Sequence, residues 1–401
     1  MAKPKLWKLN PMDFTKMTPT RKAKIAAAPA KALPATDSYK PNQLAKALHP
    51  KVQHLKVVRI EEETGNAKRY YLAPNEEKGT KSLAWFSAGQ YLSITLKIGN
   101  MTLTRPYSLA SSPRESLAGI YMLAIQKVEG GLASQFIHDT WQVGTEVTAS
   151  EPLGNFTYEP LRDAKTVVGV VGGSSITPFR SLAMAIADGD EDADLVLIYG
   201  SRTLEDTMFQ KDLEELEANC GRIKLVNVFS HEHREGYEYG FITAELIKQY
   251  APESEYSLFV CGPQVMRKFV DKEIASLGLR RKFIRNELFG EYFGPAKETD
   301  YPENVAPAFK VTVRIAGTER TITALSDVSL LRSLEANGIV APAHCRSGEC
   351  GWCHSRLVSG EVYTPRSVDG RREADFLYGY IHPCCSFPLS DLVIDVPPVC
   401  K

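Results

Sequence analysis

The sequence predicts a multidomain chain in which an antiparallel β-barrel is followed by an α/β domain with a parallel sheet and then by a small domain carrying a group of cysteines. Two changes of pattern along the chain and the position of those cysteines predict this order. At roughly 100–200 residues per domain, 401 residues leave room for it. The predicted segments are a basic extension at 1–52, the barrel at 53–160, the α/β domain at 161–290, a linker at 291–307 and the cysteine-bearing domain at 308–401.

The extension at 1–52 is set apart by its charge and its prolines. The first 51 residues hold a surplus of about nine positive charges, because lysine and arginine far outnumber Asp13 and Asp37. Repeated prolines predict that no long helix forms here. These are Pro19, Pro29, Pro34, Pro41 and Pro50. Four large apolar side chains offer anchors within the segment, namely Trp7, Met12, Phe14 and Met17.

The barrel is predicted from short segments that are rich in β-branched and aromatic residues and are separated by turn residues. The predicted strands are 52–60, 68–72, 91–98, 119–127 and 146–149. From about residue 164 the pattern changes to continuous apolar runs that alternate with helical stretches, which is typical of a parallel sheet buried on both faces. The predicted strands are 165–171, 194–199, 223–229 and 256–261, and the predicted helices are 179–188, 207–219, 242–250 and 265–277.

The linker at 291–307 is predicted from its glycines and prolines. After it, the pattern predicts a hairpin at 309–315 and 319–323, a helix at 329–336 and a last strand at 392–396.

The overall composition is that of an ordinary globular protein. Basic and acidic residues balance at 48 each, so the net charge gives no reason to expect nucleic-acid binding. No apolar run approaches the ~18–20 residues needed to cross a membrane, and the N-terminus lacks the pattern of a secretory signal. We therefore expect a cytoplasmic protein with no membrane span.

The cysteines are too few for a disulfide scaffold, but five of the eight are grouped near the C-terminus. Cys345, Cys350 and Cys353 are separated by four and two residues, and Cys384 and Cys385 follow after about thirty more. This is the plant-type spacing for a [2Fe-2S] cluster, in which one loop supplies three thiolates and a distant segment supplies the fourth. The alternative is a zinc site, which more often pairs two closely spaced Cys-x-x-Cys units.

The segment 308–401 resembles a plant-type ferredoxin of β-grasp fold. In that family the closing ligand lies four residues before a proline, which here is Pro388. The resemblance implies Cys384 as the fourth ligand and Cys385 as its neighbour. Trp352, just before the third ligand, departs from the family pattern, and it serves either packing or a surface that faces a partner.

The run at 105–112 suggests a flavin site on a barrel strand. Arg105 offers charge for a phosphate, Tyr107 after Pro106 offers a flat ring, and Ser108 offers a hydroxyl near the flavin N5. Taken alone, the run also fits a surface strand. A second motif places Gly130 and Gly131 before a short predicted helix that begins at Ser134, and a helix N-terminus preceded by glycine is a ready phosphate site.

Together with Gly89, Gln90 and Tyr91, these motifs resemble the flavin domain of the ferredoxin-NADP reductase superfamily, and the resemblance continues to about residue 290. Gly172 and Gly173 follow a predicted strand and precede a helix, as a dinucleotide loop does. The resemblance implies that this loop and Thr177 bind the nucleotide near its nicotinamide. It also implies a ribose site at Ser201 and Arg202, a nicotinamide contact at Cys261, Gly262 and Pro263, and an aromatic gate at Phe289.

The domain order resembles that of the phthalate dioxygenase reductase type of oxygenase reductase components. The resemblance implies that electrons pass from NADH or NADPH through the flavin to the [2Fe-2S] cluster and on to a partner protein, with Ser108, Thr177, Cys261 and Phe289 around the reacting flavin ring. We expect FAD, although FMN is possible as in the phthalate type, and NADH is favoured. The extension, which this family pattern lacks, is predicted to dock the acceptor or to remain a solvated tail.

Two alternatives remain open at this point. The acceptor belongs either to an oxygenase or to another reductase or demethylase system that uses no oxygen. The second alternative is that the chain is a non-catalytic electron-transfer or redox-sensing subunit that has kept these folds.

Overall fold

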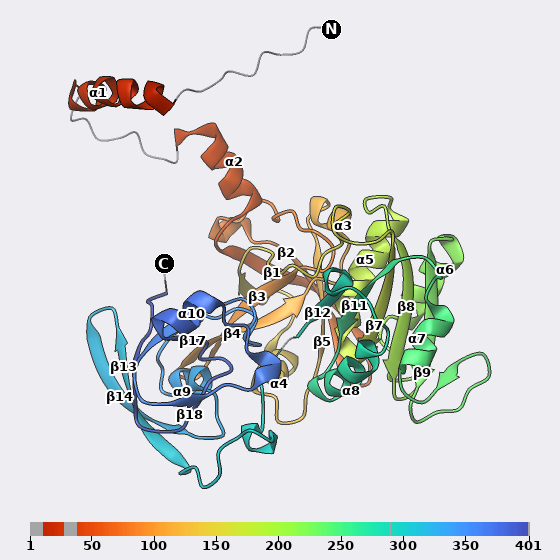
Figure 1. Ribbon diagram of the computed structural model, residues 1–401. Coiled ribbons are helices and arrows are strands. Elements are labelled where there is room, and N and C mark those ends of the chain that lie inside the picture. Colours follow the sequence, from red (N-terminus) through yellow and green to blue (C-terminus); the bar gives the residue numbers. More distant parts are fainter. Residues whose placement is uncertain (1–10, 28–37, 289, 400–401) are drawn as a thin grey trace, which may run out of the picture. The chain divides into compact units, whose positions relative to one another are not determined.

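The structure is a computed structural model that describes residues 11–27, 38–288 and 290–399. It divides into two compact units, Met1–Ala47 and Leu48–Lys401, and we describe each by itself. The smaller unit holds helix α1 (Pro11–Ala27) and nearly all of helix α2 (Lys40–Leu48) (Figure 1).

The prediction that prolines prevent a long helix in the extension is wrong, because Pro19 lies inside α1. A proline within a helix removes one backbone hydrogen bond and favours a kink, but the Lys-rich and Ala-rich segment that follows Pro19 favours the helix. Helix α2 buries no residue. Trp7 lies outside the described residues, as do the side chains of Met12, Phe14 and Met17.

The larger unit begins with the predicted antiparallel barrel. The sheet order is β4-β3-β6-β1-β2-β5, and a bridge between Leu109 and Leu123 joins its two edges. The strands are β1 (Gln53–Thr64), β2 (Ala67–Pro74), β3 (Tyr91–Ile98), β4 (Met101–Ser108), β5 (Tyr121–Gln126) and β6 (Glu146–Ala149), with helices α3 (Pro113–Leu117) and α4 (Leu132–Thr140). Leu55, Tyr70 and Leu92 are fully buried among the residues that fill the barrel.

A parallel sheet of order β10-β9-β8-β7-β11-β12 follows, as predicted. Its strands are β7 (Thr166–Gly172), β8 (Asp194–Ser201), β9 (Ile223–Phe229), β10 (Glu238–Tyr239), β11 (Tyr256–Cys261) and β12 (Ile284–Glu287). Helices α5 (Thr177–Ala187) and α6 (Gln210–Asn219) share one buried core with the sheet, and α7 (Ala244–Tyr250) and α8 (Gln264–Ala275) share another (Figure 1). The chain order reverses between β7 and β11, which is where ligands bind in open sheets of this kind.

The barrel and the parallel sheet share one core. The Phe156 ring, which follows the barrel, packs against the rings of Phe179 and Phe259, with centroids 5.5 and 5.2 Å apart. The Arg180 guanidinium on α5 donates a 2.5 Å hydrogen bond to the carbonyl of Ala110, just beyond β4. This packing holds the ends of the parallel strands against the barrel.

The C-terminal domain is a mixed sheet of order β14-β13-β19-β15-β17 with a small second sheet, β16-β18. Its elements are β13 (Ala308–Ile315), β14 (Thr318–Leu325), α9 (Leu330–Ala336), β15 (Ser355–Ser359), β16 (Val362–Tyr363), α10 (Glu373–Tyr378), β17 (Tyr380–Ile381), β18 (Phe387–Pro388) and β19 (Leu392–Asp395). The predicted hairpin, helix and last strand are all present. The cysteine loop lies between α9 and β15. Within the described part of the chain, no helix has both the length and the apolarity that a membrane crossing requires.

Candidate functional site

The four predicted cluster cysteines come together as two pairs. The thiol of Cys350 donates a hydrogen bond to the sulfur of Cys345, and the sulfurs of Cys353 and Cys384 lie 3.5 Å apart. Hydrogen bonds from Cys350 and from the N–H of Ser347 lower the pKa of the Cys345 thiol to about 5. Among the described residues, no three His, Cys, Asp or Glu side chains gather around a single metal ion. Two pairs of thiols fit a cluster with two irons, each iron taking two of the four thiolates.

The loop around these cysteines follows a path that few residues could take. Gly348 has φ +86°, and a Cβ there would lie 2.1 Å from the Val368 carbonyl oxygen and 2.9 Å from the Cys385 sulfur. Cys385 therefore packs behind the loop, where its sulfur lies 3.5 Å from the carbonyl oxygen of His382. Arg346 also has a positive φ, of 61°. Such a conformation in a residue other than glycine persists only where the surroundings impose it.

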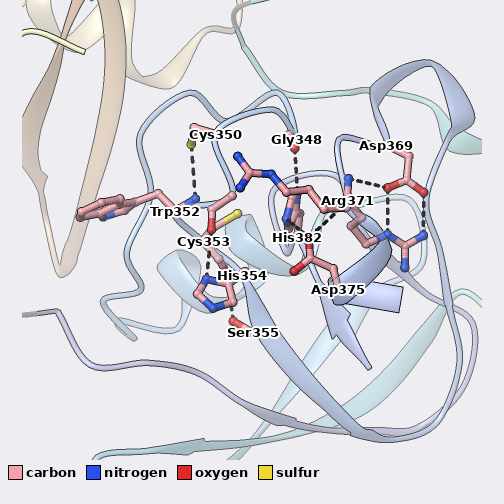
Figure 2. Close-up of polar contacts among 12 residues, drawn as sticks. Gly348, Cys350, Trp352, Cys353, His354, Ser355, Asp369, Arg371, Asp375 and His382 are labelled. Carbon is pink, nitrogen blue, oxygen red and sulfur yellow. Dashed lines mark hydrogen bonds and ion pairs between the residues drawn. The ribbon is translucent and has the colours of Figure 1, made fainter. Parts of the chain in front are cut away.

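Polar contacts hold the loop from the side of α10 (Figure 2). The buried His382 ring places Nδ1 2.7 Å from the Gly348 carbonyl oxygen, and its Nε2 lies 3.7 Å from the Asp375 carboxylate. The backbone N–H of Trp352 donates to the Cys350 sulfur at 3.5 Å. The Trp352 side chain is half exposed, at 56%, and its ring lies 4.7 Å from the His344 ring. These contacts help to hold the cysteine loop in its path.

The predicted flavin residues lie on β4 and point in different directions. Ser108 is buried and lies opposite Tyr91 in the β3–β4 pairing, and Pro106 is buried as well. Tyr107 is packed against the barrel core. Arg105 points toward the segment after β12, where its Nη2 lies 3.3 Å from the Glu291 carboxylate. Burial and the neighbouring Arg346 lower the pKa of Arg105.

The turn before α4 has the features of an anion site. Gly131 is the N-cap of the nine-residue helix and has no side chain to cap it, so it leaves the first-turn N–H groups to other partners. The Ser134 hydroxyl accepts a 3.1 Å hydrogen bond from the N–H of Val128 and so holds the turn. A cavity of about 460 Å³ adjoins Gly130, and Lys68 and Lys127 are among its lining residues. Glu62 and Glu129 line the same cavity and offset the two lysines, so the uncapped first turn of α4 is the feature that favours an anion here.

The predicted nucleotide residues meet at the switch point of the parallel sheet. Gly172 ends β7, and Gly262 follows β11. A Cβ at either glycine would lie about 2.5 Å from the Met266 sulfur, at 2.4 and 2.5 Å respectively. A Cβ at Gly172 would also lie 3.4 Å from Pro263. The Met266 side chain therefore lies over both strand ends, where the absence of a Cβ makes room for it.

Thr177 begins α5 after the short turn η3 (Gly173–Ile176), where its hydroxyl lies 3.4 Å from the Ser174 carbonyl oxygen. Ser175 in the same turn hydrogen-bonds to the buried sulfur of Cys261 on the neighbouring strand. Burial, with the nearby Glu287 carboxyl, raises the pKa of Cys261 well above its ordinary value. The thiol is thus neutral and is suited to packing beside a ring.

Glu287 is a site residue that the sequence analysis did not single out. It ends β12 and is buried, and the Oε2 atom has no hydrogen-bond partner within the described structure. Burial and the nearby Glu349 raise its pKa well above that of an ordinary carboxyl. The signal for Glu287 in the sequence was an acidic residue at the end of the strand that lies beside Cys261. A buried oxygen without a hydrogen-bond partner, at the end of β12 beside Cys261, fits a ligand that supplies the missing partner.

The two predicted ribose contacts lie at the end of β8. Ser201 ends β8, and the exposed Arg202 that follows it forms an ion pair with Asp206, with N and O 3.2 Å apart. Phe289, the predicted gate, lies outside the described residues.

Three family models match the chain in the order of its domains. The model for the oxidoreductase FAD-binding domain matches residues 54–158, that for the oxidoreductase NAD-binding domain matches 170–272, and that for the 2Fe-2S iron-sulfur cluster binding domain matches 313–389. These matches confirm the FAD, NAD and [2Fe-2S] predictions.

Known relatives agree with this assignment. The ferredoxin reductase component of 3-ketosteroid-9-alpha-monooxygenase from Mycobacterium tuberculosis is 30% identical over 314 residues, which are 77% of this chain and 84% of the relative. The glycine betaine monooxygenase reductase subunit of Chromohalobacter salexigens is 26% identical and covers 78% of this chain and 88% of its own. One of the subunits of 1,2-phenylacetyl-CoA epoxidase from Escherichia coli is 27% identical, and the aligned residues are 85% of this chain and 96% of the relative.

Among solved structures, phthalate dioxygenase reductase superposes with a TM-score of 0.61 at 24% identity, covering 86% of this chain and 98% of its own. That structure shares the fold. The relatives support a catalytic reductase and not the non-catalytic subunit that the sequence had left open. The chain therefore belongs to the ferredoxin-NADP reductase superfamily, as an oxidoreductase of the oxygenase-reductase-component type that carries electrons from a pyridine nucleotide through FAD to a [2Fe-2S] cluster.

Proposed function

We propose that this chain is the reductase component of an oxygenase system, taking electrons from NADH and delivering them one at a time to a partner oxygenase. The observation that carries the proposal is the position of Tyr91. Its ring lies 3.0 Å from the point that a Cβ at Gly154 would occupy, and a Glu287 oxygen lies 3.7 Å from the same point. Burial, followed by the charges of Cys345 and Cys350, raises the pKa of Tyr91. The end of β12, the barrel strand β3 and the cysteine loop thus adjoin one another.

The chemistry belongs to the bound groups, since flavin accepts a hydride from NADH and can release its electrons singly to an iron–sulfur cluster. The protein binds and orients them. In this proposal the cluster ligands are Cys345, Cys350, Cys353 and Cys384. The flavin phosphates are held by Arg105, Gly130, Gly131 and Ser134, and the flavin ring by Pro106, Tyr107 and Ser108. The nucleotide is held by Gly172, Gly173, Thr177, Ser201, Arg202, Cys261, Gly262 and Pro263, with Phe289 at the flavin face.

The oxygenase partner is inferred from the relatives, whose names link them to monooxygenases and an epoxidase. The test is to capture the acceptor from the native cell with the tagged full-length chain and to measure NADH-driven turnover of the captured protein with and without oxygen. We expect an oxygenase that forms product only when this chain, NADH and oxygen are all present. An acceptor that turns over equally well without oxygen would contradict the proposal.

The basic extension is proposed to speed docking of this acceptor. A surplus of about nine positive charges in 51 residues favours encounter with an acidic surface. Deletion of residues 1–50 should leave NADH oxidation with ferricyanide unchanged, slow transfer to the native acceptor and flatten its dependence on salt. A truncated chain that loses its flavin, or that serves the acceptor as well as the full chain, would contradict this role.

A further inference from the structure

Five charged side chains, three of them buried, form a group that joins β4, the segment after β12 and the C-terminal domain. The cysteine loop contributes Arg346, α9 contributes Arg332 and Glu335, β4 contributes Arg105, and the segment after β12 contributes Glu291. We call these five residues the interdomain charge cluster. Three arginines and two glutamates leave one positive charge in excess.

Arg346 is at the centre of this cluster. Its side chain has no exposed surface, and it follows Cys345 directly. Its two Nη atoms donate to the two Glu335 oxygens at 2.6 and 2.8 Å. Its Nε donates to a Glu291 oxygen at 3.0 Å, and Nη1 lies 3.3 Å from the carbonyl oxygen of Thr104 on β4. A single side chain therefore ties the cysteine loop to α9, to β4 and to the segment after β12.

Glu291 joins the same parts from the other side. One of its oxygens accepts from Arg346 and lies 3.3 Å from Arg105, and the other lies 3.2 Å from the Arg332 Nε. Burial alone would raise the pKa of this carboxyl, but the positive charges of Arg346 and Arg105 lower it. Glu291 is thus an anion in the folded protein and binds arginines from two domains.

Thr104 adds a second link between β4 and the loop. Its hydroxyl donates a 2.7 Å hydrogen bond to the carbonyl oxygen of Ala343, two residues before Cys345. The strand that carries Arg105 and Ser108 is therefore hydrogen-bonded to the segment that carries Cys345, independently of the charges. Both links hold the first cysteine of the loop against the flavin strand.

Burial of charged groups such as Arg346, Glu291 and Glu335 is a poor way to gain stability, because their desolvation offsets most of the attraction between them. Such a group of charges determines how the parts of the protein are arranged more than it stabilises the fold. Bidentate arginine–carboxylate pairs hold both partners in one plane and one direction. The same contacts hold the Arg346 backbone in the left-handed region, with φ 61°. The cluster thus specifies where the cysteine loop sits relative to β4.

We propose that Glu291, Arg346 and Thr104 are positioning residues that fix the iron–sulfur loop on the flavin strand and thereby set the rate at which electrons pass from flavin to cluster. The inference rests on the proposed function and goes beyond it, because it assigns a step of the electron path to residues that bind neither group. A small displacement of reacting groups is enough to slow a reaction strongly. Loosening this contact should slow electron transfer from flavin to cluster and leave flavin reduction by NADH unchanged.

The test is anaerobic stopped-flow mixing of the full-length holoprotein with NADH, following flavin reduction and then cluster reduction by their separate absorbance changes. Glu291→Gln keeps the shape and removes the charge, and Thr104→Val removes the uncharged link. We expect the cluster phase to slow roughly tenfold to a hundredfold in Glu291→Gln and by less in Thr104→Val, with little change in the flavin phase. Iron, sulfide and the electron paramagnetic resonance spectrum of the reduced cluster should match wild type.

The matched control is Glu319→Gln, which breaks an exposed ion pair with Arg314 in the same domain and should leave both phases unchanged. The proposal is overturned if Glu291→Gln and Thr104→Val lower the melting temperature but leave the cluster phase at the wild-type rate. If Glu291→Gln does not fold, the rate in Thr104→Val decides. A wild-type protein that shows no cluster phase at all would overturn the proposed function as well, whereas normal wild-type phases with unaffected variants reject only the positioning role.

Discussion

The sulfur of Cys353 lies 3.5 Å from the sulfur of Cys384, although 31 residues separate them in the chain. The sulfur of the adjacent Cys385 points elsewhere, lying 3.5 Å from the carbonyl oxygen of His382. Two neighbouring cysteines thus have different surroundings, and Cys384 is the one that pairs with a cysteine of the loop. This relationship supports Cys384 as the fourth cluster ligand.

Cys384→Ser should therefore lose the [2Fe-2S] cluster, whereas Cys385→Ser should keep it. Iron and acid-labile sulfide, at about two of each per wild-type chain, measure the difference. Flavin reduction by NADH should persist in both variants because it takes place in other domains. Loss of the cluster in Cys385→Ser with retention in Cys384→Ser would reverse the assignment.

Arg105→Ala should weaken flavin binding. Arg105 belongs to the interdomain charge cluster, whose three arginines and two glutamates leave one positive charge in excess. A flavin phosphate would balance that charge. Loss of a charge-assisted hydrogen bond costs about 1.5–3 kcal/mol, which is roughly a tenfold to hundredfold loss of affinity. Equilibrium dialysis of flavin measures it, with Arg59→Ala as the control because Arg59 is an exposed arginine of the same barrel. Equal affinity in Arg105→Ala and Arg59→Ala would reject this role.

Asp206→Ala should increase the use of NADPH relative to NADH. In the folded protein the Arg202 guanidinium is paired with Asp206, and this carboxylate also repels a ribose 2′-phosphate. The ratio of kcat/KM for the two nucleotides measures the effect, and wild type should favour NADH. If wild type instead prefers NADPH by about tenfold, and Arg202→Ala abolishes that preference, Arg202 binds the phosphate and our assignment fails.

Glu287→Gln should stabilise the protein at neutral and alkaline pH. Burial raises the pKa of this carboxyl, so the folded state keeps a proton that the unfolded chain releases above an ordinary pKa of about 4.3. Wild type therefore loses stability as pH rises through this window, and glutamine, which cannot ionise, does not. Melting temperatures between about pH 5 and pH 8 should show a difference that favours the variant and widens with pH. A difference that stays constant across this range would contradict the raised pKa.

Much of the fold could be predicted because its signals are local. Continuous apolar runs mark the buried parallel strands, and the spacing of Cys345, Cys350 and Cys353 marks one loop. Pro19 shows the limit of such signals, since a helix continues through it. The partnership of Arg105 with Glu291 was not predictable, because it arises only when β4 and the segment after β12 are packed together. Glu287 was missed for a similar reason, as its burial depends on the whole switch point.

The most direct test of the account is an anaerobic titration of the purified protein with NADH, followed by absorbance and electron paramagnetic resonance. A flavin that takes two electrons and a cluster that takes one predict an uptake of about three electrons per chain, with the signal of a reduced [2Fe-2S] cluster growing during the titration. Removal of the cluster by Cys350→Ser should lower the uptake to about two. Zinc without acid-labile sulfide, or a cluster that stays oxidised while NADH reduces the flavin, would contradict the account.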